Sequence, residues 1–273
     1  MADLDLAQEE LRELAGQVIE AAGNPEEPFG MYFFTPDDPQ SALARSVERE
    51  VFEQWFGNSE ELLAAEYDRY EGDTVFFSVL DHRRKLPAGM GRLGLPSPRQ
   101  CKSFDDIEKI WGVAINELLP ASTAGWDVAE TWDSMTIAVG DDYRGKATDG
   151  LISLAILQTG TQAMRRSGHR FTVAIFDTKV LALLQAMMAN PYQHFPEIGP
   201  RRYLDSPSSL PVYLDLDDWE PRLLTADPGM HELVFHGNGV EGAVRGPAWA
   251  TLLRACGLDP QPTSADVAPS ASL

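Results

Sequence analysis

The chain has 273 residues, 44% of them hydrophobic, which is enough to fill a core without disulfide staples. Its 42 acidic and 22 basic residues give a formal net charge of -20, which opposes binding to nucleic acid or to an anionic membrane. The two cysteines, Cys101 and Cys256, fit neither a metal site nor a secreted disulfide scaffold, and no stretch of about 18 apolar residues occurs. We therefore expect a cytoplasmic protein without a membrane span.

The first third of the chain alternates between helical and strand patterns. Apolar residues recur at helical spacing over residues 4–22, and residues 24–40 read as a loop around a short strand at Phe29 to Phe34. The helical period returns at 41–56 and again at 63–70, which predicts two helices in tandem. Residues 74–80 and 88–95 predict an antiparallel hairpin.

The middle of the chain continues the mixed pattern. Ser103, followed three residues later by Asp106, resembles an N-cap for a helix that runs to Pro120. Residues 126–139 predict a long strand, 151–167 a well covered helix, and 171–176 a short buried strand. Thr178 is expected to cap a helix whose inner side carries Val180, Leu183, Leu184, Met187 and Met188, and residues 211–216 predict a further strand.

Beyond Trp219 the pattern weakens to a possible strand at His231 to His236 and a short helix at Pro247 to Cys256. Five residues apart on a strand, His231 and His236 would face opposite sides, and the other histidines are scattered, so no metal site is implied. We divide the chain into residues 1–40, a main domain at 41–218, an extension at 219–257 and a disordered tail at 258–273. The fold class is α/β (α+β), with a mixed, mostly antiparallel sheet flanked by helices.

One segment suggests a ligand. An apolar strand ending at Ile137 to Val139 enters an Arg144-Gly145 turn and then, after Gly150, a helix. Backbone N–H groups at a helix N-terminus and an adjacent arginine favour a bound anion such as a phosphate. Residues 141–170 carry five basic and three acidic residues, so this stretch is locally positive within an acidic chain.

In chain order, these elements resemble the GNAT acyltransferase superfamily, and more narrowly its branch near the autoinducer synthases. The resemblance covers roughly residues 41–216. It implies transfer of an acyl group from acyl-CoA, acetyl-CoA or an acyl carrier protein to a small-molecule amine, and a possible homodimer. The segments that carry it are Val51-Phe52, Gly89 to Arg92, Trp132 to Val139, Tyr143-Arg144-Gly145 and Pro211-Val212-Tyr213.

The resemblance also implies where the cofactor lies. The N–H groups from Gly145 to Gly150, with Arg144, Lys146 and Thr148, would hold pyrophosphate. A strand bulge near Ile137 and Val139 would free a backbone N–H to polarise the thioester carbonyl. Gly150 follows the Arg-Gly pair later than the family's glycine does, and Lys146 to Asp149 fill the interval.

The resemblance also implies candidate catalytic residues. Asp133 and Glu130, three apart on the predicted strand, are the candidates for a general base. Tyr192, Tyr203 and Tyr213 lie in the half of the fold where the family places a tyrosine that protonates the thiolate. Asp133 is followed three residues later by Thr136, where autoinducer synthases carry arginine, which argues against a homoserine-lactone product.

A second hypothesis is a GNAT-like domain that binds CoA or a protein partner without catalysis. The longer interval to Gly150 and the absence of an obvious base favour it. A phosphate-binding module unrelated to CoA would need a P-loop lysine-serine pair, which the sequence lacks.

Overall fold

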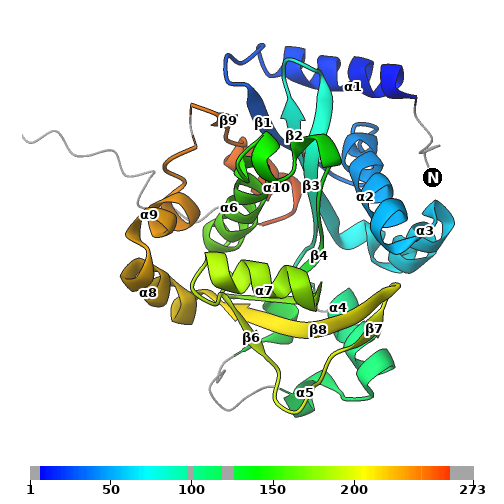
Figure 1. The fold of residues 1–273 in the computed structure, drawn as a ribbon, viewed down its shortest axis with the longest axis vertical. Coiled ribbons are helices and arrows are strands. Elements are labelled where there is room, and N and C mark those ends of the chain that lie inside the picture. Colours follow the sequence, from blue (N-terminus) through cyan, green and yellow to red (C-terminus); the bar gives the residue numbers. More distant parts are fainter. Residues whose placement is uncertain (1–6, 98–100, 119–125, 241, 259–273) are drawn as a thin grey trace, which may run out of the picture.

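The computed structural model describes residues 7–97, 101–118, 126–240 and 242–258 (Figure 1). The predicted tail at 258–273 falls outside this range except for its first residue, and so do the first residues of the predicted N-terminal helix and the end of the helix predicted to reach Pro120.

A single sheet organises the described residues, and it confirms the mixed α/β class. Its strands follow the order β6-β8-β5-β4-β3-β2-β1-β9, with β7 paired to β8. Only the β4–β5 and β1–β9 pairs are parallel, so the sheet is mostly antiparallel. The strands are β1 (Phe29–Phe34), β2 (Thr74–Asp81), β3 (Leu86–Gly94), β4 (Trp132–Val139), β5 (Phe171–Asp177), β6 (Tyr192–His194), β7 (Arg201–Tyr203), β8 (Ser206–Asp215) and β9 (Val244–Arg245).

Helices cover both faces of this sheet, with α2 and α3 at the right of Figure 1 and α6, α8 and α9 further left. The α-helices are α1 (Gln8–Ala21), α2 (Ser41–Phe56), α3 (Glu60–Tyr67), α4 (Lys102–Asp106), α5 (Ile115–Leu118), α6 (Leu151–Arg166), α7 (Thr178–Met187), α8 (Leu216–Ala226), α9 (Pro228–His231) and α10 (Trp249–Ala255). Two π-helical segments, η2 (Ile107–Trp111) and η7 (Glu232–His236), continue α4 and α9. None of the helices in these ranges is long and apolar enough to cross a membrane.

The two faces are set by strand alternation, because successive side chains on a strand point in opposite directions. Phe76 packs with Val47 and Val51 of α2, whereas its neighbour Phe77 packs with Ile156 of α6 in the larger core. Gly89 lets α6 approach β3 closely, since a Cβ there would lie 2.7 Å from Cγ2 of Ile152. The central hairpin is therefore enclosed by α2 on one side and α6 on the other.

The feature that positions the site is the separation of β4 from β5. Their parallel pairing joins Trp132 to Thr172 and ends where Ser134 meets Ala174. The pairing of β4 with β3 breaks register at the next residue, since Leu93 faces Ser134 and Arg92 faces Thr136. Met135 is thus an extra residue, a β-bulge, at the point where β4 and β5 part.

Several predictions on the first half of the chain are wrong in detail. Ser103 does not cap the helix: Cys101 occupies the N-cap position, and Ser103 bonds Asp133 instead. Gly112, with φ of 72°, ends the helical stretch that was expected to continue toward Pro120. Residues 126–131 form a coil and a 3-10 turn at Val128–Glu130, so β4 begins only at Trp132.

The second half of the chain differs from the sequence-based expectations in three places. Asp177, not Thr178, caps α7, because its carboxylate accepts from the N–H of Lys179. Val180 and Leu183 of α7 are 45% and 59% exposed, since α7 buries the side that carries Leu181 and Leu184. The strand predicted at residues 231–236 is helical: α9 passes directly into η7.

The sheet extends beyond the limits predicted for the main domain. β1, from the segment assigned to residues 1–40, pairs with β2, and β9, from the extension, pairs with β1. Apolar residues of 219–257 join the core around α6, among them Trp219, Leu223 and Phe235. The division into domains stays a prediction, and both flanking segments contribute strands to the sheet.

Candidate active site

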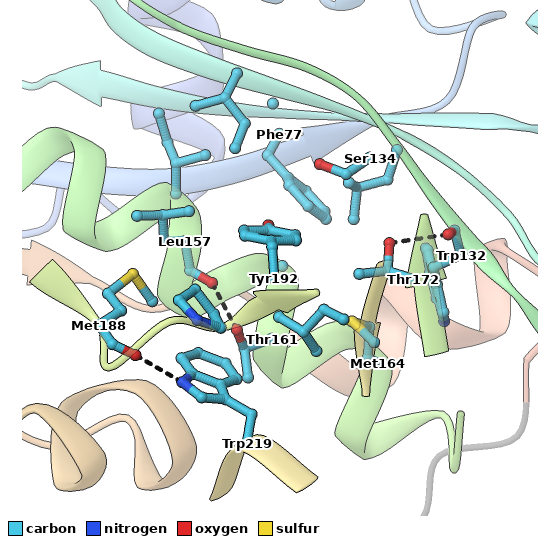
Figure 2. Close-up of a pocket in the computed structure, with 17 residues that line it drawn as sticks. Phe77, Trp132, Ser134, Leu157, Thr161, Met164, Thr172, Met188, Tyr192 and Trp219 are labelled. Atoms are coloured by element: carbon cyan, nitrogen blue, oxygen red, sulfur yellow. Dashed lines mark hydrogen bonds between the residues drawn. The ribbon is translucent and has the colours of Figure 1, made fainter. Parts of the chain in front are cut away.

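An apolar cavity of about 40 Å³ lies between α6 and the strands near the β4–β5 separation (Figure 2). β3 and β4 contribute Gly91, Leu93, Trp132, Ser134 and Ile137. The other strands contribute Phe77, Thr172, Tyr192 and Leu214. The remaining wall is formed by α6, the residues after α7 and α8: Ile156, Leu157, Gly160, Thr161, Met164, Met188, Pro191 and Trp219.

Three polar groups in this wall donate to backbone carbonyls of other wall residues. The hydroxyl of Thr161 donates to the carbonyl of Leu157, and that of Thr172 donates to the carbonyl of Trp132 (Figure 2). The indole N–H of Trp219 donates to the carbonyl of Met188 at 2.8 Å. Because these groups are satisfied, the surface they present to the cavity is predominantly apolar, which suits a hydrocarbon group.

A second pocket, of about 510 Å³, lies between the β1–α2 connection, α2, α3 and β3. It carries six carboxylates and three arginines. Each arginine is already paired: Arg45 with Glu71, Arg49 with Glu60, and Arg92 with Glu48 and Glu71. The carboxylates are Asp37, Asp38, Glu48, Glu60, Asp68 and Glu71.

The innermost wall of the charged pocket connects to β4 through hydrogen bonds. Arg92 and Glu48 are each 3% exposed, and Glu48 Oε1 also accepts from the hydroxyl of Thr136 at 2.7 Å. The hydroxyl of Tyr67 lies 3.0 Å from the same Thr136 oxygen. Burial and the negative charge of Glu48 raise the pKa of Tyr67, so its phenol stays protonated.

The bulge at Met135 decides which pocket each β4 residue faces. Regular alternation would put Thr136 on the same side as Ser134. The extra residue instead turns Thr136 toward Glu48 and Ile137 toward the apolar cavity, which Ser134 also lines. The apolar cavity therefore reaches β4 directly on one face of the sheet, and the charged pocket is linked to β4 on the other face through Glu48.

The bulge does not lie where it was predicted. Ile137 and Val139 keep regular partners on β3, namely Gly91 and Gly89. The carbonyl of Val139 also accepts from Nε of Arg144 at 2.6 Å. The residue left out of both ladders is Met135, two positions before Ile137.

The turn from β4 to α6 holds its arginine tightly. The guanidinium of Arg144 donates to Val139, lies 2.9 Å from Oδ1 of Asp141, and stacks over the ring of Trp55 at 5.1 Å. The hydroxyl of Thr148 donates to the carbonyl of Tyr143. Gly150 is the N-cap of α6, with φ of 79°, and Gly145 has φ of 54°. Lys146 is exposed.

One of the N–H groups expected to cradle the anion is used within the turn itself. The N–H of Ala147 donates to the carbonyl of Arg144, and the N–H of Leu151, just beyond the expected range, donates to the carbonyl of Thr148. The remaining donors expected to hold an anion, including those of Gly145, Lys146 and Gly150, stay predictions.

The electrostatic surroundings of this turn are more acidic than the sequence suggested. Asp141 accepts from Gln54, and Asp142 pairs with Arg84. Partial burial, together with Asp141, raises the pKa of Glu50 on α2. The basic residues Arg165, Arg166 and Arg170 lie at or beyond the far end of α6, about 20 Å away at 1.5 Å per helical residue.

Asp133 lies inside the protein, at the start of β4. Oδ1 accepts from the hydroxyl of Ser103 at 2.6 Å, and Oδ2 accepts from its N–H at 2.8 Å and from Sγ of Cys101 at 3.4 Å. Burial raises the pKa of Asp133, and these hydrogen bonds act against that rise. Glu130, the second candidate base, lies in the 3-10 turn before β4, so the expectation that it shares the strand with Asp133 is wrong.

The three candidate tyrosines lie in different surroundings. Tyr192 lines the apolar cavity, and burial raises its pKa well above the ordinary value. Tyr203 donates to Asp106 at 2.7 Å and contacts Lys102 Nζ, also at 2.7 Å. Tyr213 donates to Gln193 and packs its ring against Trp126, within a second core cluster. Of the three, Tyr192 is the one in the cavity wall.

Lys102 links this region to the charged network. Its ammonium contacts Glu66 and Asp106 and lies 5.2 Å from the ring of Tyr67. Burial lowers the pKa of Lys102, but its interactions with Tyr67 and Asp106 outweigh burial and raise the pKa to about 12. Asp215 caps α8 and pairs with Arg170.

Sequence reasoning missed Glu48, Tyr67 and Arg92. Arg92 could have been noticed as a charged residue within the otherwise apolar and glycine-rich strand Leu86–Gly94. Glu48 and Tyr67 carry no such signal, because charged and aromatic residues are ordinary on helices that are half exposed.

No protein-family model and no curated protein matches the chain. Solved structures do match it. FeeM, an N-acyl amino acid synthase from uncultured soil microbes, superposes with a TM-score of 0.51 at 10% identity, over 72% of this chain and 96% of FeeM. TofI, solved in a ternary complex with an inhibitor and MTA, matches with a TM-score of 0.47 at 14% identity, over 74% of this chain and 99% of TofI. The CoA-dependent acyl-homoserine lactone synthase BjaI matches with a TM-score of 0.44 at 14% identity, over 80% of this chain and 93% of BjaI.

The match to FeeM establishes a shared fold. The chain has a GNAT-like fold, as the resemblance of its strand, turn and helix segments implied.

Proposed function

We propose that the protein is an N-acyltransferase that moves an acyl group from acyl-CoA, or from an acyl carrier protein, to a cationic amine. The observation that carries this proposal is the position of the Met135 bulge. It lies where β4 and β5 part, with an apolar cavity on one face of the sheet and a charged pocket on the other. A donor with a hydrocarbon chain and a polar acceptor can meet at such a place.

The apolar cavity is the proposed site of the acyl chain. Its volume of about 40 Å³ accommodates only a short segment of chain. Met164 and Met188 form part of the wall, and methionine side chains rearrange easily to admit a ligand. Longer acyl groups would enter by displacing these two side chains. The thioester would then lie near Met135, and the diphosphate near the Arg144 turn.

The charged pocket is the proposed site of the amine. Its three arginines are neutralised by Glu48, Glu60 and Glu71, while Asp37, Asp38 and Asp68 add further negative charge. This balance favours a positively charged acceptor over an anionic one. The carboxylates would hold the ammonium form and accept its proton before the neutral amine attacks.

Transfer requires stabilisation of the oxyanion and a proton for the thiolate. A bulged residue is left outside the ladder, so the backbone N–H near Met135 is the proposed donor to the carbonyl oxygen. The amine nitrogen forms a bond to the carbonyl carbon and loses its extra proton, the C–S bond breaks, and Tyr192 gives its proton to the departing sulfur. The proton released from the nitrogen then restores the phenol. A buried phenol with a raised pKa is protonated at neutral pH, as this role requires.

The geometry suggests a positioning role for Asp133 rather than that of a base. Both its oxygens are occupied by donors from Cys101 and Ser103. The carboxylate would hold the start of α4 against β4, next to the bulge.

The test combines binding with turnover. Calorimetry with acetyl-CoA and longer acyl-CoAs measures donor binding, and thiol release measures transfer to a panel of amines, diamines and amino acids. We expect binding of an acyl-CoA and thiol release that depends on a cationic amine. Absence of binding to any CoA thioester or acyl carrier protein would refute the proposal. Binding without thiol release would favour the non-catalytic domain, for which the engagement of Arg144 by Asp141 is the supporting observation.

A further inference from the structure

Two histidines and a glutamate meet in the C-terminal part of the described chain, outside both pockets. Glu220 lies on α8, His231 at the end of α9 and His236 at the end of η7. One ligand atom from each side chain lies within 4.8 Å of the other two. We name these three residues the His-His-Glu cluster.

The π-helical turn is what brings the two histidines together. In an α-helix, residues five apart are separated by about 140° around the axis, so their side chains diverge. In a π-helical turn the hydrogen bond spans five residues, and residues five apart lie on nearly the same face. The ring centroids of His231 and His236 are accordingly 5.1 Å apart. A strand, as predicted from the sequence, would have separated them.

Helix α6 holds this turn in place. Three side chains on one side of α6 donate to three successive carbonyls of η7, which are those of residues 233, 234 and 235. The donors are Gln158, Gln162 and Arg165, at 2.7, 3.0 and 2.9 Å. The backbone that carries His236 is therefore fixed by side chains of a neighbouring helix, which preorganises the cluster.

His231 is the buried member of the cluster, with 5% of its surface exposed. Its Nε2 lies 3.4 Å from Oε1 of Glu220, and its ring stacks against that of Phe235. Its Nδ1 has no hydrogen-bond partner among the described residues. The nitrogen that faces Glu220 is Nε2, and it is the atom that an ion held between these side chains would contact.

We propose that the His-His-Glu cluster binds a divalent transition-metal ion, with Zn²⁺ as the best match. Two imidazoles and one carboxylate are a donor set that Zn²⁺ takes, with a water at the fourth position. Bonds of about 2.0–2.2 Å at tetrahedral angles require ligand atoms about 3.3–3.6 Å apart. Glu220 and His231 are already at 3.4 Å, so rotation of His236, which is half-buried, closes the site.

Arg165 competes with the ion for Glu220. Its Nη1 lies 3.4 Å from the same Oε1 and also donates to the carbonyl of Phe235. The second carboxylate oxygen allows Glu220 to contact both cations, an arrangement in which an outer hydrogen bond orients a metal ligand.

The ion would join α8 to η7 beside the apolar cavity. Trp219, next to Glu220, lines that cavity, and its ring centroid lies 5.0 Å from that of Phe235 on η7. The role we assign is structural, because the ion would hold the wall that Trp219 provides. It does not depend on the activity proposed above.

The experiment uses the untagged full chain, freed of metal by a chelator. Co²⁺ is titrated while the visible absorption of four-coordinate Co²⁺ is recorded, and Zn²⁺ is then added as a competitor. We expect one Co²⁺ per chain, its displacement by Zn²⁺, and a melting temperature that rises with added Zn²⁺. Glu220→Gln and His236→Gln should each weaken binding at least about tenfold.

The matched control is His194→Gln, which alters a histidine on β6 outside the cluster and should leave the affinity unchanged. Circular dichroism of each variant establishes that it is folded. Less than about 0.1 equivalent of Co²⁺ bound at a micromolar excess of ion, or equal affinities in the wild-type protein and both cluster variants, would overturn the proposal.

Discussion

The guanidinium of Arg92 and the carboxylate of Glu48 form a two-pronged ion pair inside the protein, with Nε 3.0 Å from Oε1 and Nη2 2.5 Å from Oε2. The pair joins β3 to α2, and Thr136 of β4 donates to the same carboxylate. Removing one partner of a buried pair leaves an uncompensated charge, so we expect Arg92→Met to lower the free energy of unfolding by about 3–5 kcal/mol. Urea denaturation measures this loss.

The double variant Arg92→Met with Glu48→Leu provides the control for that prediction. It removes both charges, and we expect it to recover at least about 2 kcal/mol relative to the single variant. Arg12→Met, on exposed α1, should change stability by no more than about 0.5 kcal/mol. A double variant as unstable as the single one would contradict the role of the unpaired charge.

Gly160 of α6 offers a direct test of the apolar cavity. It lines the cavity, and beyond its chain neighbours and the adjacent backbone of α6 no described atom lies within 4 Å of the position that a Cβ would take. Gly160→Phe should fill the space and reduce binding of long acyl-CoAs at least about tenfold while sparing acetyl-CoA. Calorimetry with donors of increasing chain length gives the comparison.

The matched substitution at that position is Gly160→Ala. Alanine should stabilise α6 by about 0.5–1 kcal/mol, because it restricts the unfolded chain and meets no neighbour. If Gly160→Phe weakens acetyl-CoA and long acyl-CoAs equally, the cavity is not the chain site.

The ion pair between Arg144 and Asp141 predicts opposite effects of two substitutions on CoA binding. Arg144→Ala should weaken binding about tenfold, because it removes a phosphate partner. Asp141→Asn should strengthen binding about two- to fivefold, because it releases the guanidinium from a half-exposed partner. Arg12→Ala serves as the control for loss of one positive charge. Weaker binding on Asp141→Asn would count against Arg144 as a phosphate ligand.

The raised pKa of Asp133 predicts that the stability of the protein depends on pH. Burial raises its pKa above the ordinary value of 3.8. The folded protein therefore binds the proton of this carboxyl more tightly than the unfolded chain does. The contribution of Asp133 to the free energy of unfolding is fully present below about pH 3.8, and it is lost as the pH rises through the folded pKa. We expect the unfolding free energy of the wild type to fall relative to that of Asp133→Asn as the pH rises from about 3.8 through the folded pKa.

Urea denaturation of both proteins across that range, at constant ionic strength, measures the difference. Ser103→Ala is a useful companion, since it removes a hydrogen bond that favours the charged carboxylate and should make the wild-type trend steeper. A difference that stays constant with pH would mean that Asp133 keeps an ordinary pKa in the folded protein.

Local pattern determined most of the secondary structure. The hairpin of β2 and β3, the helices α2, α6 and α7, and the strand β5 all lie within a few residues of their predicted positions, because each buries one face at a regular period. The strand, Arg-Gly turn and helix order also carried the resemblance that the fold confirms. Such patterns are local, and a sequence displays them directly.

Tertiary structure alone decided the site. Whether Thr136 faces Glu48 depends on one extra residue in the pairing between β3 and β4. The hydrophobic periodicity of the sequence does not reveal such an extra residue. Arg92 and Glu48 are 44 residues apart, and only the packing of α2 on the sheet brings them together. His231 and His236 share a face because side chains of α6 hold a π-helical turn. Each of these depends on contacts between distant segments, whose geometry exists only once the core has formed.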